Sequence, residues 1–218
     1  MQMPNTTREP PAGRRRSQAV GTLAALAAAG AVVVWMAPAF GEGPGFDCGK
    51  ADGSVEELIC RDSELAALDR TLTAAYQRAL ERAAEDNYED PRPLQRGWVT
   101  GRNDCWKAKD ARACVEASYK QRIAELQIGY GDFVVPSPVT YACDAFDMSA
   151  VFYRETDPPT VVLTPVGRHE GAAQALAFLA PSASGAKYEG ANVVFWEHHG
   201  EAMLTWFGEE LTCRVKGR

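Results

Sequence analysis

The sequence has few of the residues and motifs that mark an enzyme. Its only histidines are His169, His198 and His199, and the adjacent pair would point to opposite faces of a strand, so no shared metal site is expected. It has no phosphate-binding glycine loop, no dinucleotide-binding fingerprint and no G-x-S-x-G nucleophile motif. We therefore predict a binding protein without catalysis, metal or cofactor.

Positive charge is also scarce. The 29 acidic residues outnumber the 23 lysines and arginines, which gives a net charge of -6. Nucleic-acid-binding proteins are usually basic, so a nucleic acid is not expected as a partner. Four of the arginines lie in the first 39 residues, so the rest of the chain is more acidic still. Such a surface favours a basic partner through electrostatic steering.

The N-terminus has the organisation of an export signal. Arg14-Arg15-Arg16 precede an apolar run over residues 19–36, and Ala37-Pro38-Ala39 has the small-x-small form of a cleavage site. We interpret residues 1–39 as a secretory signal peptide that sends the protein to the periplasm, the cell envelope or the extracellular space. The alternative is an uncleaved membrane anchor, which would be the protein's one link to a membrane.

Residues 54–127 have helical periodicity. Ser54-Val55-Glu56-Glu57 has the form of a capping box, and apolar residues then recur three, four or seven positions apart. Asp62-Ser63 predicts a brief interruption, the polar stretch 87–93 predicts a turn, and Asp110 predicts a new helix start. The pattern predicts a helical hairpin whose apolar faces bury each other.

After a glycine- and proline-rich linker over residues 129–138, the periodicity changes to two. Eight short, closely spaced strands predict a small antiparallel barrel or sandwich. The predicted strands cover residues 139–144, 147–154, 160–165, 174–179, 186–190, 192–197, 201–207 and 211–216. The chain is thus predicted to be an α+β protein with more than one domain.

The six cysteines are expected to form disulfides, because export places them in an oxidising compartment. We favour two local bridges, Cys48–Cys60 and Cys105–Cys114, which would staple the small helical hairpin. Pairing across the hairpin is the alternative. Cys143 lies in the first predicted strand and Cys213 in the last, so a bridge between them would tie together the ends of a closed sheet.

Aromatic residues gather near the C-terminus. Phe195-Trp196 and Trp206-Phe207 are adjacent pairs within predicted strands. Since successive side chains of a strand point to opposite faces, one member of each pair must face outward. The inward members are expected in the core, and an outward aromatic beside a loop is a typical interface anchor.

Several short segments of the second half carry a family resemblance. They are Tyr141-Ala142-Cys143, the stretch from Ser182 to Tyr188, Val194-Phe195-Trp196, Gly200-Glu201-Ala202, and Cys213. On their order and spacing, residues 139–216 resemble the MliC/PliC-type inhibitors of c-type lysozyme. The resemblance implies a small eight-stranded barrel.

The same resemblance implies a binding mode. In the family, a loop with an S-G-x-x-Y motif enters the lysozyme cleft, where its serine meets a catalytic carboxylate, and a lysine of the next loop meets another. Here Ser184, Gly185 and Tyr188 form the motif, and His199-Gly200 stands where the family has lysine before glycine. Ser184, Gly185, Tyr188, His199 and Gly200 are therefore expected to bind a c-type lysozyme.

The first half resembles the N-terminal domain of LprI-type lysozyme inhibitors. The matching segments are Phe46 to Ala51, Glu56 to Cys60, Leu65 to Asp69, Trp98, Arg102 to Cys105, Cys114 and Tyr119 to Leu126. The resemblance covers residues 46–128.

These observations predict an exported protein that inhibits c-type lysozyme by inserting the Ser184 loop. The first alternative is a cell-envelope interaction module that binds peptidoglycan or another envelope protein without inhibiting lysozyme. The second is a glycan-cleaving enzyme that uses Glu197 and Glu201 as its carboxylate pair.

Overall fold

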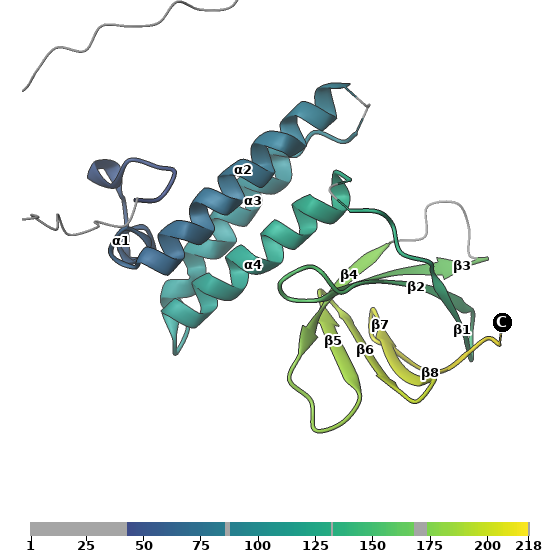
Figure 1. Ribbon diagram of the computed structural model, residues 1–218. Coiled ribbons are helices and arrows are strands. Elements are labelled where there is room, and N and C mark those ends of the chain that lie inside the picture. The colour runs from purple at the N-terminus through teal and green to yellow at the C-terminus, as the bar shows by residue number, and fades with distance from the viewer. Residues whose placement is uncertain (1–42, 86–87, 132, 168–173, 218) are drawn as a thin grey trace, which may run out of the picture. The chain divides into compact units, whose positions relative to one another are not determined.

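The computed structural model describes residues 43–85, 88–131, 133–167 and 174–217 (Figure 1). The predicted signal peptide, residues 1–39, lies outside the described residues. In the part of the chain that is described, no helix has the length and apolar character needed to cross a membrane.

The predicted helical hairpin is confirmed, and each of its two arms consists of more than one helix. The first arm consists of α1 and α2, and the second consists of α3, a short 3-10 turn and α4 (Figure 1). The elements are η1 (Cys48–Lys50), α1 (Ser54–Arg61), α2 (Ser63–Glu85), α3 (Arg92–Asn103), η2 (Asp104–Lys107) and α4 (Ala111–Gly129).

Two aspartates begin new helices where the sequence predicts breaks. The Asp62 carboxylate accepts hydrogen bonds from the backbone N–H groups of Glu64 and Leu65, at 3.0 and 3.1 Å, and so caps α2. The Asp110 carboxylate accepts from the N–H of Ala113 at 2.9 Å and caps α4. Both satisfy donors that have no partner within their own helix.

The predicted capping box at α1 is wrong. Ser54 is the first helical residue, and the N-cap is Gly53, which has no side chain to cap with and adopts a φ of 111°. Glu56 instead accepts a hydrogen bond from the backbone N–H of Asp52 at 2.8 Å. With Gly53 as the N-cap, the helix starts one residue earlier than predicted, so the serine hydroxyl is not placed to cap it.

A buried polar network lies inside the helical core. The Tyr119 hydroxyl donates to the Asp69 carboxylate at 2.7 Å and accepts from the Arg102 guanidinium at 2.8 Å. Asp69 also accepts from the backbone N–H of Gly45 at 2.7 Å, which ties the N-terminal segment to α2. The Arg102 guanidinium lies over the Trp98 ring, 5.4 Å from its centroid. Tyr119 thus connects two buried charges.

The second part is a closed antiparallel barrel, which settles the choice between barrel and sandwich. Its described strands pair in sequence order, and β1 also pairs with β8 to close the sheet. The strands are β1 (Val139–Cys143), β2 (Asp147–Tyr153), β3 (Thr160–Val166), β4 (Ala175–Ala180), β5 (Ala186–Gly190), β6 (Val193–His198), β7 (Glu201–Trp206) and β8 (Glu209–Val215). They match the predicted strands closely.

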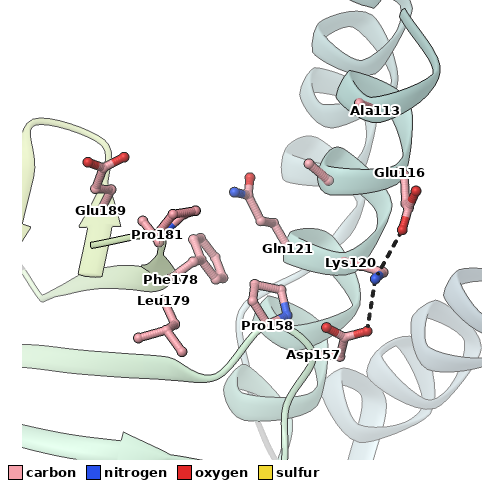
Figure 2. Close-up of a pocket in the computed structure, with 12 residues that line it drawn as sticks. Ala113, Glu116, Lys120, Gln121, Asp157, Pro158, Phe178, Leu179, Pro181 and Glu189 are labelled. Atoms are coloured by element: carbon pink, nitrogen blue, oxygen red, sulfur yellow. Dashed lines mark ion pairs between the residues drawn. The ribbon is translucent and has the colours of Figure 1, made fainter. Parts of the chain in front are cut away.

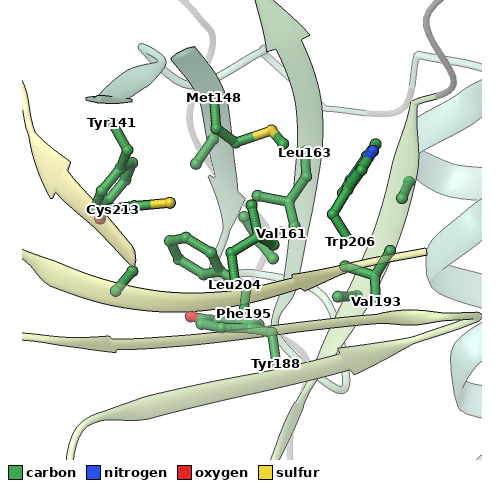
Figure 3. Packing of buried hydrophobic residues seen from close by; sticks show 14 of the residues in the cluster. Tyr141, Met148, Val161, Leu163, Tyr188, Val193, Phe195, Leu204, Trp206 and Cys213 are labelled. Carbon is green, nitrogen blue, oxygen red and sulfur yellow. The ribbon is translucent and has the colours of Figure 1, made fainter. Parts of the chain in front are cut away.

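Large apolar side chains fill the barrel interior (Figure 3). Phe195 of β6 lies at its centre, and the ring of Tyr141 meets it edge to face with centroids 5.2 Å apart. As strand alternation predicts, Phe195 and Trp206 point inward. Their neighbours Trp196 and Phe207 lie on the outside, and Phe207 belongs to the turn between β7 and β8.

All three favoured disulfides are confirmed. Cys48–Cys60 links the start of the helical part to α1, and Cys105–Cys114 links η2 to α4. Cys143–Cys213 joins β1 to β8, where the two residues are direct cross-strand partners.

The network at Tyr119 makes a stability prediction. Burial raises the pKa of Tyr119, so its hydroxyl stays protonated and able to donate to Asp69. Replacing Tyr119 with Phe leaves two buried charges without their shared partner, and we expect a loss of about 1–3 kcal/mol in the free energy of unfolding. Urea unfolding followed by far-ultraviolet circular dichroism measures it. Tyr76→Phe is the matched control, because no described hydrogen bond uses the Tyr76 hydroxyl, and equal stability of the two variants would contradict the prediction.

Candidate partner-binding site

The topology brings the two predicted binding segments to one end of the barrel. In a barrel whose neighbouring strands are antiparallel, successive connections alternate between the ends, so the β4–β5 loop and the β6–β7 turn share an end. The first contains Ser184 and the second is His199-Gly200. Ser184, Gly185 and His199 are exposed, and Gly200 is half-buried.

The Ser184 loop is held by hydrogen bonds on both sides of the serine. The Ser182 hydroxyl donates to the carbonyl of Gly185 at 3.0 Å, and the Trp196 indole donates to the carbonyl of Ser184 at 2.8 Å. No described hydrogen bond uses the Ser184 hydroxyl. The loop backbone is therefore fixed, while the exposed hydroxyl keeps its donor and acceptors for another molecule.

Both the backbone conformation at position 185 and the lack of space for a side chain require glycine there. Its φ of 66° lies in the left-handed region, which favours glycine. A Cβ atom at this position would collide with the backbone carbonyl of Glu197 and would lie 3.1 Å from the Cβ of His198. The Ser184 loop thus packs directly against the end of β6.

The β6–β7 connection is a two-residue hairpin turn. His199 and Gly200 have φ values of 55° and 85°, as the central residues of a type I′ turn require. The Glu197 carboxylate accepts from the backbone N–H of Gly200 at 2.8 Å and braces the turn. The His198 and His199 rings lie 4.1 Å apart between centroids, and both are exposed.

A hollow of about 260 Å³ opens beside the Ser184 loop. Trp196 and Met203 are cross-strand partners on the outside of the barrel, and both line it together with His198. Met203 is 63% exposed, which is unusual for so apolar a side chain, and it was not among the residues predicted for the site. Strand alternation could have identified Met203, because its neighbours Ala202 and Leu204 face the barrel interior and Met203 must therefore face outward.

Tyr188, the last residue of the S-G-x-x-Y motif, lies apart from the exposed residues. It is only 7% exposed, and its ring packs in the barrel core 5.7 Å from that of Phe152. Burial raises the pKa of Tyr188. The motif is thus divided between the surface, which carries Ser184 and Gly185, and the core, which contains Tyr188.

Lys187, which precedes Tyr188, is half-buried and pairs with Glu189 at 2.5 Å.

The carboxylates near the turn already have partners. Glu197 accepts from Gly200, and Glu201 pairs with Arg214 at 3.1 Å. Both carboxylates are thus engaged in contacts within this end of the barrel. Among the described residues, no three His, Cys, Asp or Glu side chains gather as metal ligands.

Side chains elsewhere in the chain lie outside this site. Figure 2 shows Lys120 of α4, which pairs with Glu116 one turn earlier at 3.1 Å, and Phe178 and Leu179 of β4. None of them belongs to the Ser184 loop or to the β6–β7 turn. The candidate site is therefore formed by one end of the barrel.

Comparison with known proteins supports a relationship over both parts. Residues 141–212 match the family described as membrane-bound lysozyme-inhibitor of c-type lysozyme. Lipoprotein LprI of Mycobacterium tuberculosis (strain ATCC 25618 / H37Rv) is 34% identical over 175 residues, which cover 79% of this chain and 85% of that protein. Lipoprotein LprI of Mycobacterium bovis (strain ATCC BAA-935 / AF2122/97) matches to the same extent. The chain therefore belongs to the LprI family and carries an MliC domain in its second half.

Proposed function

We propose that the protein inhibits c-type lysozyme at the bacterial cell envelope, without catalysis of its own, by placing its Ser184 loop in the enzyme's active-site cleft. The description of the matched family as a lysozyme inhibitor supports the target, and the relatives, which are named lipoproteins, support the location. The observation that carries the proposal is the exposed Ser184 hydroxyl on a backbone that Trp196 and Gly185 hold in place.

The chemistry of the loop suits the lysozyme cleft. The cleft carries two carboxyl groups that perform the reaction. A serine hydroxyl donates a hydrogen bond to a carboxylate, and bonds of this kind to a charged acceptor are stronger than those between neutral groups. Because the Ser184 loop is already fixed, little conformational entropy is lost when it binds. A filled cleft excludes the polysaccharide.

The β6–β7 turn would make the contact with the second carboxyl group of the cleft. His199 occupies the position of the family's lysine, and an N–H of its ring would donate a hydrogen bond to the other carboxylate. The charged groups of this turn and its neighbours are Glu197, Glu201 and Arg214, besides the second histidine, His198. Glu197 and Glu201 are engaged with Gly200 and Arg214, which reduces their repulsion of the enzyme.

The charge of the barrel also favours this target. Residues 139–218 contain more acidic than basic side chains. The c-type lysozymes are usually strongly basic, so opposite charges would accelerate the encounter. This contribution weakens as salt screens the charges.

The first test removes the serine hydroxyl. In a turbidity assay of lysozyme on bacterial cell walls at low salt, the oxidised protein should inhibit in a dose-dependent manner. Ser184→Ala should weaken inhibition by about tenfold or more, the worth of one hydrogen bond to a charged group. Ser137→Ala, another exposed serine, should leave it unchanged. A folded, oxidised protein that does not inhibit lysozyme would refute the proposal and favour the envelope-binding alternative.

A second test concerns the support of the loop. Trp196→Phe keeps an aromatic ring but removes the N–H that bonds the Ser184 carbonyl. We expect several-fold weaker inhibition, measured by the dissociation rate from lysozyme, with a change in unfolding free energy of about 1 kcal/mol. Phe207→Leu is the control, because Phe207 is an exposed aromatic of the β7–β8 turn at the other end of the barrel. Equal dissociation rates for both variants would contradict this role of Trp196.

A third test concerns the charge at His199. Lysine carries a permanent positive charge at this position, whereas glutamine carries none. His199→Lys should therefore bind lysozyme more tightly than His199→Gln at low salt, and the difference should shrink as salt screens the charge. Calorimetric titration of each variant into lysozyme at two salt concentrations measures both affinities. Equal affinities of the two variants at low salt would contradict a charged contact at this turn.

A further inference from the structure

An exposed tryptophan stands out in the helical part. Trp106 belongs to η2 and is 62% exposed. Its preceding neighbour, Cys105, is buried and bridged to Cys114 of α4, which holds the segment in place. The ring is in contact with the Lys107 ammonium, 5.5 Å from the ring centroid, and remains largely open to solvent. A large apolar surface is thus presented on a rigid support.

Trp106 forms one wall of a hollow of about 340 Å³. The start of α1, including Gly53 and Ser54, forms a second wall, and the end of α3, including Thr100 and Asn103, forms a third. The volume is sufficient for one or two sugar rings, and the lining combines the apolar indole with polar side chains. The hollow lies wholly within the helical part and shares no residue with the Ser184 site.

The charges around this hollow are largely balanced. Asp104 pairs with Lys107 at 2.6 Å, and Glu56 lies 3.6 Å from the Arg102 guanidinium. Asp52 is the remaining carboxylate among the lining residues. Since two of the three acidic groups are neutralised locally, neither a strongly anionic nor a strongly cationic ligand is favoured.

Hydrogen-bonding groups are available around the indole. The Arg102 guanidinium donates twice to Oδ1 of Asn103, so among the described contacts the Asn103 amide nitrogen keeps its donors. The first turn of α1 has no side-chain cap, which leaves backbone N–H donors at Gly53 and Ser54. The Ser54 and Thr100 hydroxyls add acceptors.

We propose that this hollow is a binding site for a neutral saccharide. A sugar ring has an apolar C–H face and a rim of hydroxyl groups, and this combination matches an exposed indole bordered by amide, hydroxyl and backbone groups. The C–H face would lie on Trp106, and the hydroxyls would bond Asn103 and the start of α1. A lipid chain would cover the polar groups of Ser54 and Asn103 without bonding them, and a basic peptide would require unpaired carboxylates. The site gives the helical part a function separate from lysozyme inhibition.

The test uses the isotope-labelled protein isolated after export and the tetramer of β-1,4-linked N-acetylglucosamine, with the glucose tetramer alongside. The indole N–H signal of Trp106, assigned with Trp106→Phe, should shift and saturate in the millimolar range or below with at least one tetramer. Calorimetry should show that Trp106→Ala weakens binding by about tenfold, the order of one stacking contact. Leu94→Ala is the matched control, since Leu94 is also 62% exposed on the helical part and lies outside the hollow.

The outcomes separate this proposal from the function of the barrel. Saturable shifts that are lost in Trp106→Ala and kept in Leu94→Ala, with unchanged lysozyme inhibition, would support a separate saccharide site. Absence of shifts with both tetramers would overturn it, as would undiminished binding by a folded Trp106→Ala variant. A Trp106 shift caused by a lysine-rich peptide and by neither tetramer would also overturn it.

Discussion

The pairing of β1 with β8 is the constraint on which the candidate site depends. Closure gives the sheet a fixed curvature, and within this sheet the pairing of β5 with β6 places the β4–β5 loop against the end of β6. Cys143 and Cys213 are cross-strand partners at this junction, and their bridge spans 70 residues. On the chain-entropy model, a loop of that length stabilises the folded state by about 4 kcal/mol. A barrel formed by so short a segment of chain benefits from such a contribution.

Two consecutive residues of β6 organise both halves of the site. The Trp196 indole holds the Ser184 carbonyl on one side, and the Glu197 carboxylate holds the Gly200 N–H on the other. Gly185 lies against the same strand end. A change at the end of β6 is therefore expected to act on both candidate binding segments together, whether or not Trp196 and Glu197 themselves touch a partner. Tyr188 anchors the same region from the core side.

Residue patterns predicted the barrel well because its strands alternate between a filled interior and solvent, and the positions of Cys143 and Cys213 indicated where it closes. Helix breaks at Asp62 and Asp110 were predictable because short acidic side chains cap locally. The polar network at Tyr119 was not predictable from the sequence, because periodicity does not reveal which buried polar groups meet across helices. Trp106 was missed because it lies in a 3-10 segment outside the helical pattern.

The histidine in the β6–β7 turn reflects a balance between conformation and charge. Both central residues of this turn have a positive φ, and histidine adopts that conformation more readily than most residues that are not glycine. Lysine would supply a permanent charge but would strain the backbone more. The bond from the Gly200 N–H to Glu197 stabilises the same conformation and places a carboxylate close to the ring. This turn therefore favours a well-defined hairpin over a permanent positive charge, so on the proposed binding mode the fixed Ser184 loop would be the main contact with the enzyme.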